Sequence, residues 1–323
     1  MTSRKIARLL LAPGLALALA GCVMGPAGHG SFERTLAVNG PVAMEVESGS
    51  GEVIISRGAA GSVRVRGEFE VYGRLDESPS EKIAALQQDP PVVQQGNSIR
   101  LTRPRDVFGA VRINYTITVP EETSVRASSG SGRIEVSGLR GPVRLESASG
   151  GLRLLDVSGD AETRSSSGSQ QLTNIGGSAR TRANSGSLTL ENVRGEVRVE
   201  AGSGRVTIAH PGARVYAETR SGEIRVDDAP SDVHAEAGSG SINVSGSPKE
   251  RFLWEIETRS GSVTLDLGMR SSYRLEARTS SGRFRLEPEL RIQEQTRRLL
   301  RATAGDGIGR ISVQTGSGTI RLR

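Results

Sequence analysis

The residues that build disulfides, metal sites and aromatic pockets are scarce in this sequence. Its 323 residues include one cysteine, Cys22, so no internal disulfide can form. The three histidines, His29, His210 and His234, lie far apart and have no further cysteine beside them, so we expect no metal site and no cofactor. Aromatic residues make up only 3% of the chain, which points to a thin interior filled by valine, leucine, isoleucine and alanine.

Charge and hydropathy exclude further classes of protein. The formal net charge is +6, but Arg4, Lys5 and Arg8 carry three of these charges, which leaves +3 for the rest of the chain. Such a small excess over so long a chain gives no reason to expect a nucleic-acid partner. No stretch beyond the N-terminal one is apolar enough to span a bilayer, which takes about 20 apolar residues.

The N-terminus has the features of a secretion signal. A basic start is followed by the apolar stretch from Leu9 to Ala20, which is too short to cross a bilayer. It leads into Gly21 and Cys22, and this ending resembles the bacterial lipobox, in which the cysteine is lipidated and becomes the first mature residue. We therefore expect a signal peptide over 1–21, a lipid on Cys22 that holds the protein to a membrane, and a flexible tether over 22–30.

Two details qualify this expectation. The residue after the cysteine is Val23 rather than aspartate, and the lipobox resemblance then implies outer-membrane sorting in a diderm bacterium. The alternative to a lipid anchor is an ordinary cleaved secretory signal with an incidental cysteine.

An 18-residue repeat dominates the rest of the chain. The motif is Ser-Gly-x-apolar-x-apolar, and its glycines are Gly132, Gly150, Gly168, Gly186, Gly204, Gly222 and Gly240. Further units stand at Gly51, Gly261, Gly282 and Gly318. A second apolar pair lies seven and five residues before most of these glycines, as in Val197 and Val199. Alternation of apolar residues with period two predicts strands, and glycine marks the turns between them.

The repeat predicts an all-β fold in which each unit is one coil of a single-stranded parallel β-helix, a β-solenoid with about 18 residues per coil. One coil cannot bury its apolar stripe alone, so coils stack about 4.8 Å apart. We assign 121–323 to the repeat and 31–120 to N-terminal coils with a capping insertion. Within the latter, Ser78, Pro79 and Glu81 predict a short helix that runs to Gln88. A charged insertion at about 287–308, a loop or short helix, interrupts the repeat.

The Ser-Gly pairs have a structural interpretation and a functional one. They are Ser131-Gly132, Ser149-Gly150, Ser185-Gly186, Ser203-Gly204, Ser221-Gly222 and Ser239-Gly240. In the structural interpretation glycine takes a positive φ at the corner, and stacked serines hydrogen-bond from coil to coil. The functional alternative is a hydroxyl-lined binding strip. Because no histidine or aspartate stands at a fixed offset, no serine nucleophile is indicated.

The sequence resembles the bacterial putative-adhesin family of unknown function. The matching features are the strand end Ile117-Thr-Val-Pro120, the serial Ser-Gly units, and the closing run from Gln314 to Ile320. The resemblance covers about residues 35–323. It implies a right-handed single-stranded β-helix in the cell envelope, and it implies no particular chemistry.

Two sets of outward residues are candidate sites. Glu200, Glu218, Glu236 and Glu257 each stand four residues before a repeat glycine, so stacking would place them in a ladder about 5 Å apart. We interpret this ladder as a solvated face compensated by Arg220 and Arg259, because opposed like charges destabilise a sheet. The alternatives are a site for a cation or basic ligand, and the carboxylates of a glycan-cleaving enzyme. Calcium-binding β-rolls are excluded, since aspartate does not follow the repeat glycines.

The second set is aromatic. Tyr216 and His234 hold equivalent outward positions on adjacent coils and form a candidate stacking pair for a sugar ring.

These observations favour a lipid-anchored, non-catalytic binding or scaffold module of the cell envelope, adhesin-like and monomeric, with a protein or glycan partner. One alternative is an accessory component of envelope-stress sensing. The other is a glycan-active β-helix enzyme.

Overall fold

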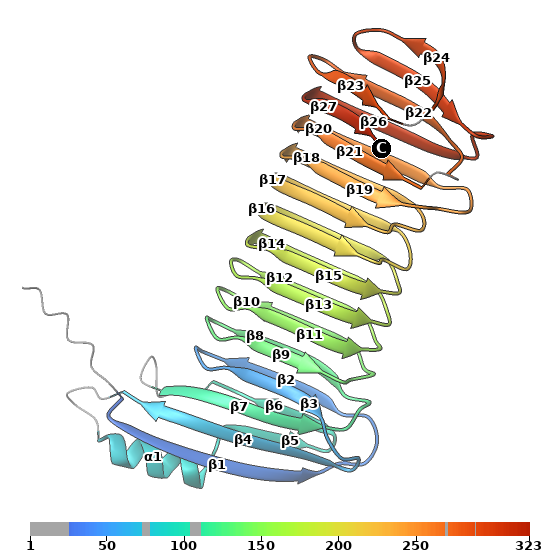
Figure 1. Cartoon of the computed structure of the whole chain (residues 1–323). Helices are drawn as coiled ribbons and strands as arrows, with labels where there is room; N and C mark the ends of the chain where they lie inside the picture. Colours follow the sequence, from blue (N-terminus) through green and yellow to red (C-terminus); the bar gives the residue numbers. More distant parts are fainter. Residues whose placement is uncertain (1–25, 73–77, 104–110, 269–270, 288) are drawn as a thin grey trace, which may run out of the picture.

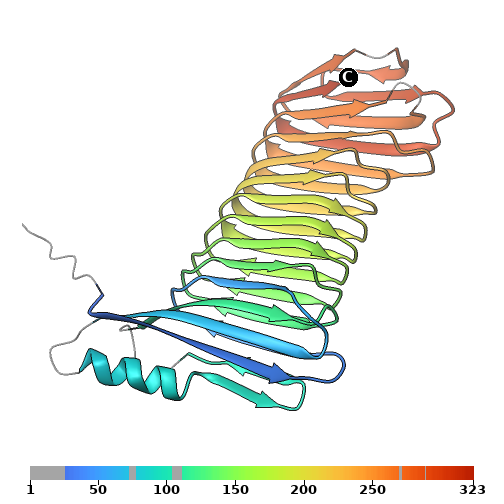
Figure 2. The same cartoon turned by 60° about the horizontal axis from the view of Figure 1, so that its bottom comes forward.

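The computed structural model describes residues 26–72, 78–103, 111–268, 271–287 and 289–323. Within them the chain forms 27 strands and one α-helix, which confirms the expected all-β class. Figures 1 and 2 show a long rod of stacked strands with the helix at the N-terminal end. The expected signal peptide and Cys22 lie outside the described residues. No helix in the described ranges is long and apolar enough to cross a membrane.

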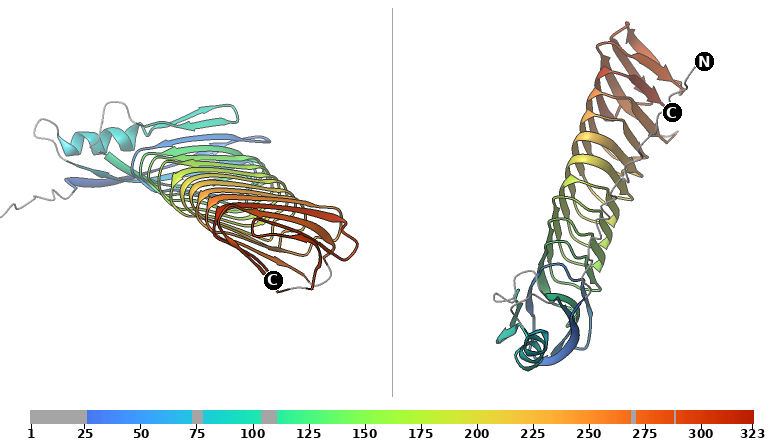
Figure 3. Two further views of the ribbon diagram at one scale, coloured as in Figure 1. Left: turned by 90° about the horizontal axis from the view of Figure 1, so that it is seen from above. Right: turned by 90° about the vertical axis from the view of Figure 1, so that its left-hand side faces the viewer.

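Two stacks of parallel strands form the two sides of the rod, and we call them the A stack and the B stack (Figure 3). The A stack contains β2 (Ala43–Ser48), β8 (Ser124–Ser129), β10 (Val143–Ser147), β12 (Ala161–Ser165), β14 (Ala179–Ser185), β18 (Val233–Ser239), β20 (Leu253–Ser260), β22 (Tyr273–Thr279) and β26 (Gly309–Ser317). The B stack contains β3 (Val53–Arg57), β9 (Ile134–Ser137), β11 (Leu152–Val157), β13 (Gln170–Ile175), β15 (Leu188–Val193), β19 (Ile242–Gly246), β21 (Val263–Leu267), β23 (Arg283–Leu286) and β27 (Thr319–Leu322). The long strands β16 (Val197–Ala209) and β17 (Val215–Asp227) turn the corner and belong to both stacks.

The register within the repeat is constant. Val143 lies opposite Ala161 in the A stack, and Leu152 lies opposite Gln170 in the B stack, so each partner is one repeat unit further along the chain. Period-two alternation then sends the same positions of every unit inward. In one unit Val197, Val199, Val206 and Ile208 are all fully buried. A further inward position lies at or just beyond the end of the strand in five units and is held by Leu139, Val157, Ile175, Val193 and Ala229, all buried.

The repeat glycines are needed because neighbouring coils approach closely. A Cβ on Gly204 would lie 2.0 Å from the carbonyl oxygen of Gly186, and Gly204 has a φ of +121°. The serines contribute less than the sequence predicts, because Ser203 and Ser185 form the one hydrogen bond between two serine hydroxyls among the described Ser-Gly pairs, at 3.4 Å. At the corners of Gly132 and Gly150 other serines accept the hydrogen bond. The backbone N–H groups of these two glycines donate to the hydroxyl oxygens of Ser129 and Ser147.

A second corner ladder has no counterpart in the sequence-based interpretation. Five non-glycine residues adopt φ between 51° and 58°, and each stands one repeat unit after the last: Asp156, Asn174, Asn192, His210 and Asp228. Asparagine and aspartate tolerate this left-handed region better than other side chains. Their side chains also pair along the rod: the Asn174 amide donates to Asp156 at 2.7 Å, and the Asn192 amide donates to Asn174 at 3.0 Å.

The N-terminal end of the rod is closed by antiparallel strands and the helix. β1 (Gly28–Ala37), β4 (Ser62–Val71) and β7 (Val111–Val119) pair antiparallel in that order, as do β5 (Val92–Gln95) and β6 (Ser98–Leu101). The helix α1 (Pro79–Gln88) has the predicted bounds, packs beside β1 and buries Leu86, although Ser78 makes no side-chain capping bond. β1 begins inside the expected tether 22–30, because Gly28 pairs with Val71.

The order of the coils in space departs from their order in the chain at both ends. β2 and β3 lie between β6 and β7 on one side and β8 and β9 on the other. Likewise β26 and β27, the last strands of the chain, lie between β20–β21 and β22–β23. The outermost coil at the C-terminal end is therefore β22–β23, and the C-terminal strands are held between two neighbours.

The charged insertion at 287–308 is neither a loop nor a helix. It contains β24 (Arg291–Gln295) and β25 (Leu299–Ala304), which pair antiparallel, and β25 also pairs antiparallel with β22. The physical reason is a short alternation that the charges obscure in the sequence, since Leu300 and Ala302 both point inward and are buried.

Candidate binding face

The outward side of the A stack carries two rows of side chains that run along the rod. The first row is Glu45, Arg126, Arg144, Glu162, Arg180, Arg198, Tyr216, His234 and Glu255. The second row, two residues further along each strand, is Glu47, Ser128, Glu146, Arg164, Arg182, Glu200, Glu218, Glu236 and Glu257. Because the register is constant, the strands place these side chains in fixed lines.

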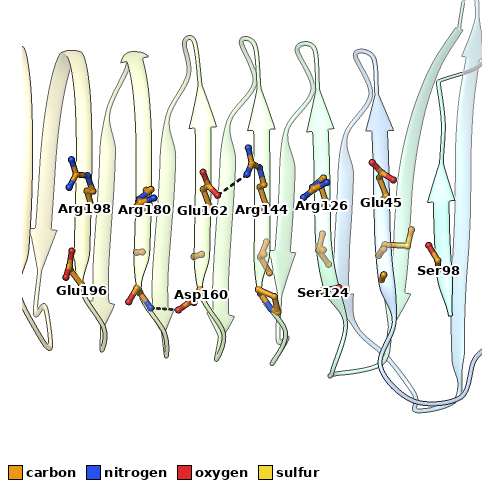
Figure 4. Close-up of a pocket in the computed structure, with 18 residues that line it drawn as sticks. Glu45, Ser98, Ser124, Arg126, Arg144, Asp160, Glu162, Arg180, Glu196 and Arg198 are labelled. Atoms are coloured by element: carbon orange, nitrogen blue, oxygen red, sulfur yellow. Dashed lines mark hydrogen bonds and ion pairs between the residues drawn. The ribbon is translucent and has the colours of Figure 1, made fainter.

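Three open hollows follow these rows. The first has a volume of about 730 Å³ and lies along the first row, from β2 to β16 (Figure 4). The second, of about 720 Å³, lies beyond the second row, where the small residues Ala148, Ser166, Asn184 and Gly202 leave room. A smaller hollow of about 330 Å³ separates the rows near Arg126 and Glu146.

The first hollow has two chemically different banks. In Figure 4 one bank holds the arginines of the first row together with Glu45 and Glu162, and the other holds Ser124, Asp160 and Glu196. The first bank offers guanidinium donors, whereas the second offers hydroxyl and carboxylate acceptors. One oxygen of Asp160 already accepts the backbone N–H of Ser178 at 2.8 Å, which fixes the position of that carboxylate.

The arginines and glutamates of the two rows form an ion-pair network. Arg144 bridges Glu146 at 2.8 Å and Glu162 at 3.2 Å, and Arg164 also pairs with Glu162 at 2.8 Å. Glu200 accepts a hydrogen bond from Arg198 at 2.9 Å and one from Arg182 at 3.2 Å. The hydrogen bond from Arg198 is the largest of the effects that hold the pKa of Glu200 below its ordinary value.

Two arginines of the first row stand outside this network. Within the described residues, the side chains of Arg126 and Arg180 form no hydrogen bond or ion pair, and both are exposed. The glutamates nearest to Arg180 in the rows, Glu162 and Glu200, are each shared by two other arginines.

The structure brings the four predicted glutamates together as a ladder. Glu200 lies opposite Glu218, Glu218 opposite Glu236, and Glu236 opposite Glu257. The predicted compensation is wrong, because Arg220 and Arg259 pair with none of them in the described part of the chain. Compensation is instead confined to Glu200, while Glu218 accepts a hydrogen bond from the Tyr216 hydroxyl at 3.2 Å.

The predicted aromatic pair also meets. The rings of Tyr216 and His234 stack with their centroids 4.8 Å apart and an interplanar angle of 8°. The guanidinium carbon of Arg198 lies 4.3 Å from the centre of the Tyr216 ring. Both faces of Tyr216 are therefore occupied by protein side chains, which leaves only the edge of that ring for a sugar, and sugar stacking on the pair stays a prediction.

The electrostatics of Glu200 differ from those of the general acid of a glycoside-cleaving enzyme. A glycoside-cleaving pair needs one carboxyl group with a raised pKa, so that it can donate a proton near neutral pH. The pKa of Glu200 moves in the opposite direction. Among the described residues, no group of three or more histidine, cysteine, aspartate or glutamate side chains could hold a metal ion.

Sequence reasoning missed the arginine bank and the hollows. The signal was present, since Arg126, Arg144, Arg180 and Arg198 hold the same position in four of the repeat units. Only the spatial register shows that this recurrence forms the side of a hollow.

Comparison with known proteins gives a family and three distant structural likenesses. The family model described as Toastrack DUF4097 matches residues 88–323. No curated protein matches the chain. Among solved structures, a putative lipid binding protein from Parabacteroides distasonis is 9% identical with a TM-score of 0.45, over 92% of this chain and 98% of that one.

Two further structures are similar at the same level. A putative adhesin from Bacteroides fragilis is 13% identical with a TM-score of 0.31, covering 91% of this chain and 97% of that one. A putative cell adhesion protein from Clostridium sporogenes is 12% identical with a TM-score of 0.22, covering 90% and 98%. All three TM-scores lie below 0.5.

Proposed function

The chain belongs to the Toastrack DUF4097 family, and from that premise and the face described above we propose that it is a lipid-anchored, non-catalytic binding module of the cell envelope. In this proposal the body is a right-handed single-stranded β-helix with one repeat unit in each coil. The parallel registers of both stacks support that geometry. The ligand, a protein or a glycan, lies on the outward side of the A stack.

One observation carries the proposal: the hollows of the A stack follow the rod and are lined by charged side chains that the ion-pair network holds in place. Such lines of preorganised side chains lower the entropic cost of binding an extended partner. The hollows are open troughs that run over several strands. A trough of this kind fits a long ligand better than the enclosed pocket that a small substrate requires.

The test is to fill the first hollow with a large side chain. We expect the full chain to bind one or more members of a panel of envelope glycans and envelope proteins saturably, with no turnover of the glycans. Ser178→Trp should weaken that binding, because Ser178 is exposed and lines the hollow. Thr189→Trp is the matched control, since Thr189 is equally exposed but lies on the B stack.

Two outcomes would contradict the proposal. Equal loss of binding in both tryptophan variants would show that the A stack is not the binding face. Cleavage of a glycan by the purified chain would show that the protein is an enzyme.

The anchor has its own test. We propose that Cys22 carries the lipid and that the protein is held, as a monomer, at the outer membrane of a diderm cell. Cys22→Ser should move the protein from the membrane fraction to the soluble fraction, and mass spectrometry of the wild-type N-terminus should show an acylated Cys22. A Cys22→Ser protein that stays in the membrane fraction would argue for a cleaved signal and another mode of attachment.

A further inference from the structure

We propose that the first hollow of the A stack binds a linear acidic glycan, with Arg126 and Arg180 pairing with its carboxylate or phosphate groups. This inference rests on the proposed binding role of the A stack and names the class of ligand for it. It commits to a polymer that alternates acidic sugars with hydroxyl-rich neutral ones.

The pattern of ion pairs identifies the two anchor residues. Glu162 is shared by Arg144 and Arg164, and Glu200 is shared by Arg182 and Arg198. These four arginines are already matched by acceptors of the protein. Arg126 and Arg180 have no such acceptor in the described residues, and each guanidinium presents donors in a planar fork that matches a carboxylate or phosphate.

The neighbours of Arg126 and Arg180 increase the demand for an external anion. In the parallel register Arg126 lies opposite Arg144 on one side and Glu45 on the other, and Arg180 lies opposite Arg198 on one side and Glu162 on the other. Glu45 already pairs with Arg100, and Glu162 already pairs with Arg144 and Arg164, so these glutamates are shared with other arginines. Like charges at opposed positions of a sheet destabilise it. An anion between the members of each pair would offset that repulsion, so ligand binding relieves a cost that the free protein carries.

The spacing of the anchors sets the spacing of the ligand's charges. Arg126 and Arg180 are separated by three steps of the first row, through Arg144 and Glu162. At about 4.8 Å per step, their backbones lie about 14 Å apart along the rod. A chain with an acidic group on every sugar would bring its intervening charges against Glu162, whereas a chain with sparser charges would not.

The opposite bank favours a glycan over a denser polyanion. Ser124, Asp160 and Glu196 lie across the hollow from the arginines (Figure 4), and Ser178 also lines the hollow. Hydroxyl and carboxylate oxygens accept hydrogen bonds from sugar hydroxyls, but they would repel a polymer charged along both edges. A glycan that turns its acidic groups to one bank and its hydroxyls to the other satisfies both.

The same face disfavours an anionic membrane as the partner. Beyond Tyr216 and His234 the rows continue as Glu236, Glu255 and Glu257. A flat bilayer laid along the A stack would bring its headgroups against these carboxylates. A polymer can leave the groove before it reaches them.

The experiment uses the full chain and hyaluronan oligosaccharides, which carry one carboxylate for every two sugars. The matched probe is the methyl ester of the same oligosaccharides, which keeps the hydroxyls and removes the charge. We expect saturable binding of hyaluronan and, for Arg126→Gln/Arg180→Gln, a dissociation constant at least about tenfold higher, as expected for the loss of charge-assisted hydrogen bonds. Both substitutions leave the ion-pair network intact and remove one member of each pair of opposed arginines, so the unfolding temperature should equal or slightly exceed that of the wild type.

The control variant is Arg194→Gln/Arg251→Gln. These arginines are also exposed and also lack a side-chain partner among the described residues, but they lie in loops outside the A stack. Their loss changes the net charge by the same amount and should leave the affinity for hyaluronan unaltered. An equal loss of affinity in both double variants would reduce the effect to general electrostatics and overturn the assignment to Arg126 and Arg180.

The remaining outcomes separate this inference from the proposed function. Equal affinity for the esterified oligosaccharides, still abolished by Ser178→Trp, would overturn the acidic ligand and keep the binding face. Tighter binding to polyphosphate, or to vesicles of phosphatidylglycerol and phosphatidylcholine, than to hyaluronan would overturn the assignment of a glycan as the ligand. Absence of hyaluronan binding at low ionic strength would also overturn the acidic glycan as the ligand. The proposed binding function fails only if no member of the wider panel of glycans and proteins is bound.

Discussion

The repeat glycine is the residue on which the spacing of the coils depends. At Gly204 the backbone has a φ of +121°, and a Cβ would lie 2.0 Å from the Gly186 carbonyl oxygen. The same contact recurs at Gly186, where a Cβ would lie 2.1 Å from the Gly168 carbonyl oxygen. An added methyl group would therefore have to push two coils apart, in a part of the rod where both are held in register by their strands.

We expect Gly204→Ala to lower the free energy of unfolding by about 1–3 kcal/mol from backbone strain, with a further loss from the contact between coils. Urea denaturation followed by circular dichroism measures this change. Gly151→Ala is the control, because a Cβ there meets its nearest atom at 3.7 Å, and we expect its effect to stay within about 0.5 kcal/mol. If the two substitutions cost the same, close approach of the coils is not what requires glycine.

Glu200 illustrates how the ion-pair network depends on pH. The hydrogen bond from Arg198, followed by smaller contributions from Arg182, lowers the pKa of Glu200 from its ordinary value of 4.5. A carboxyl group whose pKa is lower in the folded state stabilises the fold above its unfolded pKa and loses that contribution as the pH falls through the folded pKa.

Glu200→Gln should therefore reduce the free energy of unfolding at neutral pH by about 1 kcal/mol or less. The difference between wild type and variant should shrink as the pH is lowered below 4.5, the ordinary pKa of this carboxyl group. Denaturation midpoints measured from neutral pH downward give the curve. Glu236→Gln removes a charge from the same row without breaking an ion pair of the described residues, so it should show no loss at neutral pH. A constant difference for Glu200→Gln at all pH values would contradict the argument.

At the scale of strands and coils, the way the chain ends matters more than the repeat itself. The last strands, β26 and β27, lie inside the rod and pair on both sides, with β20–β21 and with β22–β23. The antiparallel strand β25 instead pairs with β22 on the A side of the tip, and β24 pairs with β25. Two segments close together in the sequence thus make very different contributions to the fold.

We expect a chain that stops at Ala304 to lose its cooperative unfolding transition in the C-terminal coils, because β22 and β23 would have no parallel neighbour. Replacing 291–304 by a short Gly-Ser linker removes β24 and β25 but keeps β26 and β27, so it should keep that transition. Limited proteolysis and thermal unfolding compare the two. Equal resistance to protease would contradict the position of the last coil.

The placement of β26 and β27 between earlier strands also marks the limit of what the sequence predicts. Period-two alternation places inward residues such as Val197 and Ile208 correctly, and the step of the repeat aligns Tyr216 with His234. Nothing in the alternation says which unit pairs with which, because all units offer the same apolar stripe. The interior position of β26 and β27 follows from long-range pairing, which local patterns do not encode.

The candidate site was partly predictable, because a fixed offset from the repeat glycines can be counted in the sequence whereas contacts between strands cannot. The glutamate ladder follows from counting, since four glutamates share one offset from the repeat glycines. The arginine bank was missed because the sign of the outward charge changes along each row, as at Arg144, Glu162 and Arg180. The hollows depend on the sizes of side chains from several strands, which only the assembled stack shows.

At the scale of the whole molecule, the rod is a sum of nearly equivalent coils. In such proteins each coil contacts mainly its neighbours, so stability adds from coil to coil. Because the step of the repeat is constant from Gly132 to Gly240, a whole unit within that range can be removed without changing which side chains face inward. A deletion that is one residue shorter than a repeat unit shifts every later strand by one residue. Such a shift exchanges the inward and outward faces of each of these strands.

The sharpest test of this architecture compares two deletions that differ by a single residue. Deleting 197–214 brings Val215 into the place of Val197, its parallel partner, and leaves the inward positions apolar. Deleting 197–213 puts Arg214 there instead and turns Val215 outward. We expect the first variant to keep the β-sheet circular dichroism spectrum and a cooperative transition, with a smaller dependence on urea because less surface is exposed on unfolding. The second should lose the cooperative transition, because an arginine would have to enter the core. If both variants fold equally well, the register of the stack is not what specifies the rod.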